Sequence, residues 1–121
     1  MATTCKLIAK TTLGSSAANI EYVDIPATYD DLLLVYSLRG DTSNNYQTMS
    51  FNGSTSNFTQ RELQGNGSTV SSTSRTDSII RESVAPSTYT ASTFSSTVIY
   101  IPNYSGSSNK SFSVDSVVET N

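Results

Sequence analysis

The chain of 121 residues has no histidine, no tryptophan and a single cysteine, Cys5. The absence of histidine excludes an imidazole-based catalytic triad and removes the commonest neutral metal ligand. One cysteine can form neither an internal disulfide nor a thiolate zinc site. No segment has the regular Asp/Asn spacing of a calcium-binding loop. We therefore expect a protein that is not an enzyme, with no catalytic residues, no metal and no cofactor.

Charge and long apolar segments are also scarce. Seven Lys and Arg residues against ten Asp and Glu give a net charge of −3, which is a poor match for a nucleic-acid backbone. The longest apolar runs, Leu32–Tyr36 and Val98–Ile101, are too short to cross a bilayer. The first ten residues lack the apolar core of a signal peptide. Neither nucleic acid nor a membrane is expected as a partner.

Serine and threonine make up a third of the chain, with 23 Ser and 17 Thr. The apolar residues among them nevertheless cluster and alternate as they do in strands. The segment Thr93–Pro102 places Phe94, Val98 and Tyr100 on one face and two isoleucines on the other. Apolar residues on both faces predict a strand that is buried on both sides.

Further strands are predicted by the same periodicity. Lys110–Thr120 alternates as a half-buried strand. Tyr29–Leu38 could form a short helix or a strand, and its β-rich surroundings favour the strand. The remaining predicted strands are Lys6–Thr12, Asn19–Ile25, Tyr46–Asn52, Phe58–Gln64 and Asp77–Val84.

Tight turns are predicted between these segments at Asn52-Gly53 and Asn66-Gly67. The polar stretch Gln64–Ser78 is too long for a hairpin turn, and we expect it to form an exposed, mobile loop or arm. The pattern as a whole predicts a single all-β domain over residues 1–121. Its expected architecture is a jelly-roll-like β-sandwich of about seven or eight short strands.

Two groups of residues are candidates for recognition surfaces. Arginine is enriched at protein interfaces because its planar guanidinium pairs with two acceptors and stacks on rings. Ordinary solvated surface pairs, such as Arg81 with Glu82, explain the arginines equally well. Two tyrosines in turn-rich stretches could contact a glycan, although tyrosine is also a common strand residue. The candidates are Arg39, Arg61, Arg75 and Arg81 for an interface, and Tyr89 and Tyr104 for a glycan.

Several segments together resemble a family of small virion structural proteins of tailed bacteriophages, common among phages of marine and freshwater bacteria, including cyanobacteria. The similarity covers nearly the whole chain. Its parts are Lys6–Tyr22, Ile25–Leu32, Phe51-Asn52-Gly53, Arg61–Ser68, Ile99–Tyr104 and Asn109–Asp115. Family members continue with further strands beyond the position of Glu119. The resemblance therefore implies that these strands are missing here or are supplied by a neighbouring subunit.

The resemblance implies a β-sandwich component of a virion that is made in the host bacterial cytoplasm. Small size and low charge favour a capsid decoration or cement protein, which would contact the major capsid protein and form homo-oligomers. The alternative is a tail-fibre or receptor-binding module that contacts tail proteins and presents Tyr89 and Tyr104 to a host glycan. A free carbohydrate-binding module is a third possibility, weakened by the absence of tryptophan.

Overall fold

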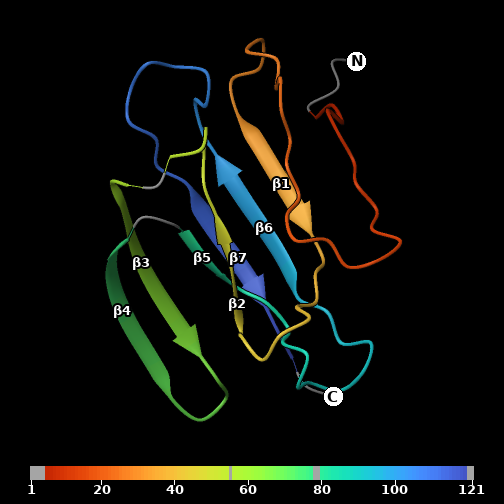
Figure 1. The fold of residues 1–121 in the computed structure, drawn as a ribbon. Helices are drawn as coiled ribbons and strands as arrows, with labels where there is room; N and C mark the ends of the chain where they lie inside the picture. Colours follow the sequence, from red (N-terminus) through yellow and green to blue (C-terminus); the bar gives the residue numbers. More distant parts are fainter. Residues whose placement is uncertain (1–4, 55, 78–79, 120–121) are drawn as a thin grey trace. The chain divides into compact units, whose positions relative to one another are not determined.

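The computed structural model describes residues 5–54, 56–77 and 80–119, and all regular structure in these ranges is β-strand (Figure 1). Seven strands occur in this part of the chain. They are β1 (Leu32–Tyr36), β2 (Tyr46–Met49), β3 (Phe58–Gly65), β4 (Val70–Asp77), β5 (Ile80–Ser83), β6 (Ser96–Ile101) and β7 (Ser113–Val117). The prediction of an all-β chain with about seven strands is confirmed.

The strands form three antiparallel sheets. One sheet has the order β1-β6-β7, and the other two are the pairs β2-β5 and β3-β4. These antiparallel sheets are consistent with a β-sandwich, and the jelly-roll order of strands stays a prediction. No helix in the described ranges is long and apolar enough to cross a membrane.

The chain divides into two compact units. The described residues of one unit are 5–34 and Ile99–Ser113, and those of the other come from Val35–Val98 and 114–119. Strands β2, β3, β4 and β5 lie wholly in the second unit. A single domain over residues 1–121 stays a prediction.

Strand β6 buries every second side chain from Thr97 onward. Thr97, Ile99 and Ile101 are almost fully buried, whereas Val98 and Tyr100 are 37% and 42% exposed. The prediction that both faces of this strand are buried is therefore wrong. The face that carries Val98 and Tyr100 is partly in contact with water. Such exposure is ordinary, because more than half of the surface of a folded protein is apolar.

The prediction of a loop over Gln64–Ser78 is wrong as well, because most of this stretch forms β-strand. Strands β3 and β4 pair along their full length from Phe58↔Asp77 to Gly65↔Val70 and form a long hairpin (Figure 1). The turn between them is held by Asn66, whose Oδ1 accepts hydrogen bonds from the backbone N–H groups of Ser68 and Thr69. Pairing with β3 supplies hydrogen-bond partners for the backbone N–H and C=O groups of β4, although β4 has few apolar side chains.

The expected strands Lys6–Thr12 and Asn19–Ile25 are absent from the structure. Near the end of the second segment Asp24 has a φ of 54°, which interrupts an extended backbone. Asp77–Val84 is not one strand either: β4 ends at Asp77 and β5 begins at Ile80, with residues 78 and 79 outside the described ranges. Tyr29–Leu38 contains strand β1, so strand rather than helix is confirmed there.

Candidate functional site

A polar cavity lies within the second unit, where the β2-β5 pair and the β3-β4 hairpin supply its walls. Its volume is about 100 Å³. The lining residues come from the entry and start of β2, from β3, β4 and β5. They are Asn45, Tyr46, Glu62, Gln64, Arg75, Glu82 and Ser83. The cavity thus combines two carboxylates, one guanidinium and two side-chain amides.

Glu82 is the most deeply buried charged residue described, with only 3% of its surface exposed. It pairs with Gln47 across the β2-β5 ladder. Two residues further along the chain, Val84 is also buried. Burial, together with the nearby charge of Glu62, raises the pKa of Glu82 to about 7. Near neutral pH this carboxyl therefore exists in both its charged and its neutral form.

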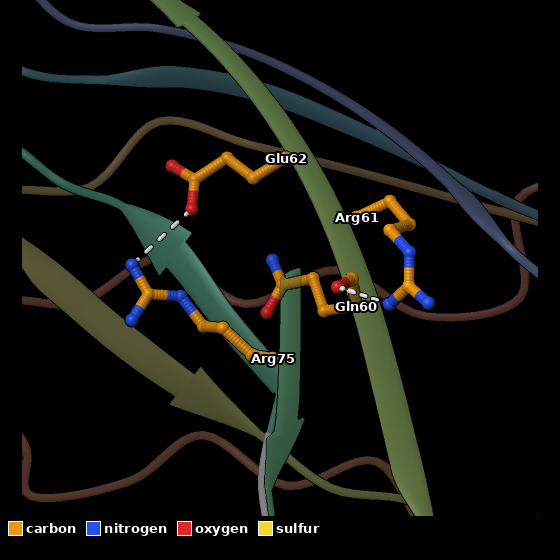
Figure 2. A network of polar contacts seen from close by, with 4 residues as sticks. All are labelled: Gln60, Arg61, Glu62 and Arg75. Atoms are coloured by element: carbon orange, nitrogen blue, oxygen red, sulfur yellow. Dashed lines mark hydrogen bonds and ion pairs between the residues drawn. The ribbon is translucent and has the colours of Figure 1, made fainter. Parts of the chain in front are cut away.

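Arg75 reaches the same cavity from the hairpin. Arg75 pairs with Gln60 across the ladder, so its side chain lies on the face that also carries Glu62. Its Nη2 lies 3.5 Å from Glu62 Oε2, and Figure 2 shows the two side chains converging beside the strands. This is a long ion pair between half-buried groups, which contributes little to stability.

Two buried atoms at the cavity have no hydrogen-bond partner within the described residues. They are Nε of Arg75, which can only donate, and Oε1 of Glu82. A buried polar atom without a partner costs about 1–3 kcal/mol, so such atoms are rare in folded proteins. One donor and one acceptor without a partner therefore belong to residues that line the same cavity.

The neighbourhood of Glu82 continues as a polar interior. Tyr36 of β1 accepts a hydrogen bond from the side-chain amide of Gln47. Burial, with a contribution from the charge of Glu82, raises the pKa of Tyr36 to about 12. Thr97 hydrogen-bonds the Ser116 hydroxyl at 2.9 Å. At least these two of the many hydroxyl groups in the sequence therefore satisfy each other inside this unit.

Arg39 has a different environment from the cavity residues. Its two terminal nitrogens donate four hydrogen bonds of 2.8–3.0 Å to backbone carbonyls of the segment that follows β5. The carbonyls belong to Ser87, Tyr89, Thr90 and Thr93. Arg39 thus anchors a connecting segment, and a role at an interface stays a prediction.

The other predicted site residues are dispersed. Arg61 is exposed on β3, on the opposite side of the strand from Glu62 (Figure 2). Arg81 lies opposite Thr48 in the β2-β5 ladder, and its side chain lies outside the described part of the structure. Tyr89 and Tyr104 belong to different units. Tyr104 donates its hydroxyl hydrogen to the carbonyl of Pro26.

Sequence reasoning missed Glu82, which it treated as part of a solvated surface pair. A signal was present in the sequence, because Glu82 stands between Ile80 and Val84 at a spacing of two residues, the period of a strand face. This spacing places the middle residue on the same strand face as its aliphatic neighbours, and Val84 is buried. Only the fold could show that Arg75, seven residues earlier, reaches the same cavity.

No group of three or more metal-ligating side chains occurs in the described ranges. Comparisons with protein-family models, with curated proteins and with solved structures each found no match.

Proposed function

We propose that this chain is a structural protein of a tailed-bacteriophage virion, acting as a decoration or cement protein on the capsid surface. It would bind the major capsid protein and further copies of itself. The observation that carries the proposal is the exposed face of the β3-β4 hairpin, which has the features of a surface that another subunit covers. The resemblance of the sequence to virion proteins agrees with it.

The exposed face of the hairpin is lined by side chains from both strands. Leu63 and Val70 are 79% and 75% exposed. The register places them on the same face as Arg61, which is also exposed. The centre of an interface is more apolar than the rest of a protein surface, and arginine is enriched there. We call this surface, made by Arg61, Leu63 and Val70, the hairpin face.

The hairpin also has open edges. Strands β3 and β4 pair with each other, and no other strand of the described ranges pairs with their outer sides. A two-stranded hairpin alone is only marginally stable in water. Unpaired strand edges bind further strands readily. Contact with a neighbouring subunit would therefore stabilise the hairpin and also supply hydrogen-bond partners for the backbone groups at its edges.

The segment before β1 supports the same proposal. It lies outside the strands, and it exposes aliphatic side chains such as Leu7 and Val23, 76% and 69% exposed. Scattered single apolar residues on a surface carry no meaning, but a succession along one segment favours a covering partner. The many copies on a capsid would multiply a modest contact area into a large total stabilisation.

Immunogold labelling of intact virions with antibodies against the recombinant chain tests the proposal. We expect dense label over the heads, in many copies per particle. Label confined to tails or fibres would favour the alternative, a receptor-binding module, and would overturn the cement role. Absence of label, together with absence of the chain from dissociated virions by mass spectrometry, would overturn both. Virions of a phage lacking the gene serve as the control.

A further inference from the structure

We propose that the cavity between the β2-β5 pair and the β3-β4 hairpin binds a neutral, hydroxyl-bearing ligand, namely one edge of a carbohydrate. This inference concerns a binding site and does not depend on where in a virion the chain resides. It involves neither Tyr89 nor Tyr104.

The hydrogen-bonding capacity of the cavity defines the ligand. Nε of Arg75 has a hydrogen to donate, and Oε1 of Glu82 has lone pairs to accept with. A hydroxyl group both donates and accepts, so adjacent hydroxyls of one ligand can satisfy both atoms. The side-chain amides of Asn45 and Gln64 also line the cavity. They add further donors and acceptors of the same kind.

The charges at the cavity exclude ligands of high charge. Two carboxylates oppose an anion, and the guanidinium of Arg75 opposes a cation. The charges of Glu62 and Arg75 offset each other at 3.5 Å. The carboxyl of Glu82, with a pKa of about 7, is partly neutral at physiological pH. A neutral polar ligand is the class that this combination favours.

The size of the cavity limits how much of the ligand enters. A volume of about 100 Å³ has room for several water molecules. The cavity therefore admits a few hydroxyl groups at one edge of a sugar ring, with the rest of the ring outside. Both atoms are buried, so the Arg75 side chain must shift before a ligand reaches them, against its long contact with Glu62. Such a contact is weak, and the Arg75 side chain is 36% exposed.

The test is a titration of the ¹⁵N-labelled chain with methyl glucoside, methyl galactoside and methyl mannoside, followed by NMR. The Nε–H of Arg75 and the side-chain amides of Asn45 and Gln64 give separate signals. We expect at least one sugar to shift the Arg75 signal saturably, and equal concentrations of glycerol to have little effect. Saturation by calcium chloride instead would identify a cation site and overturn the proposal.

Two variants localise the effect. Arg75→Lys removes the Nε donor but retains the charge, and we expect about tenfold weaker binding of the sugar that binds the unmodified chain. Arg61→Lys, the matched change on the opposite side of β3, should bind that sugar as the unmodified chain does. Equal weakening in both variants, or no saturable shift with any sugar in the unmodified chain, would overturn the proposal. Equal shifts with glycerol would show a response to any small polyol rather than to a sugar, and would also overturn the proposal.

Discussion

Arg39 and Arg75 belong to the same unit but differ in how many of their N–H groups form hydrogen bonds. Arg39 donates four hydrogen bonds of 2.8–3.0 Å to backbone carbonyls. Arg75 has one ion pair at 3.5 Å, and its buried Nε lacks a partner within the described residues. The guanidinium of Arg39 uses its terminal nitrogens in hydrogen bonds within the fold. The guanidinium of Arg75 still has a donor that a ligand could use. A charged residue indicates a ligand only where its own fold leaves it unsatisfied.

The largest effect is expected at Glu82, whose carboxyl shares the cavity with Arg75. Its pKa lies near 7 in the folded chain, above the ordinary 4.5. The folded state therefore binds the proton more tightly than the unfolded state. The stability due to this carboxyl is fully present below pH 4.5 and is lost as pH rises through 7. The free energy of unfolding should fall by roughly 3 kcal/mol across this range.

Urea denaturation between pH 4 and pH 8 measures this loss, with Glu82→Gln as the comparison. The glutamine variant should lack this part of the pH dependence and should be the more stable protein at pH 8. The other groups around Glu82 are Glu62, Arg75 and Tyr36, and the pKa of Tyr36 lies at about 12, outside the range. Asp31 has a lowered pKa because it accepts hydrogen bonds from Tyr100 and Asn103, so it titrates below the range. Parallel pH profiles for the two proteins would contradict the prediction.

Arg39→Ala should produce the next largest effect. The substitution removes all four hydrogen bonds to the segment after β5, and water can replace only part of them because the site is half-buried. We expect a loss of about 2 kcal/mol in the free energy of unfolding. Hydrogen exchange should accelerate at Ser95, whose N–H is bonded to Leu38 beside the anchor. An unchanged free energy of unfolding would show that the four hydrogen bonds of Arg39 do not stabilise the fold.

The sequence could predict the class of fold but not the difference between these arginines. The pattern of apolar residues located β1, β6 and β7, and in β6 every second side chain is buried. It missed β4, whose run of Ser and Thr is stabilised by pairing with β3 rather than by burial. It also predicted strands before β1 that do not form, since a strand needs a neighbour that local sequence does not specify. Burial of Glu82 beside Arg75 likewise depends on which strands pair.

Glu62→Gln should have a small effect on stability, because the ion pair with Arg75 is long and half-exposed. We expect a change of about 1 kcal/mol or less. The pKa of Glu82 should fall, since the charge of Glu62 contributes to raising it. NMR titration of the Glu82 carboxyl carbon measures this shift. An unchanged pKa would mean that burial alone sets it, and that the two carboxylates do not interact.

Arg61→Ala should have the smallest effect on the chain itself. Within the described structure its guanidinium donates one hydrogen bond, at 3.2 Å, to the carbonyl of the adjacent Gln60. The free energy of unfolding should change by less than about 0.5 kcal/mol, as for most exposed positions. Self-association or binding to capsids should weaken, because Arg61 lies beside Leu63 on the hairpin face. Sedimentation velocity and capsid co-sedimentation measure both, with Thr59→Ala at the next exposed position as the control. If the Arg61→Ala chain were destabilised but associated normally, Arg61 would not be an interface residue. It would instead stabilise the fold, as Arg39 does.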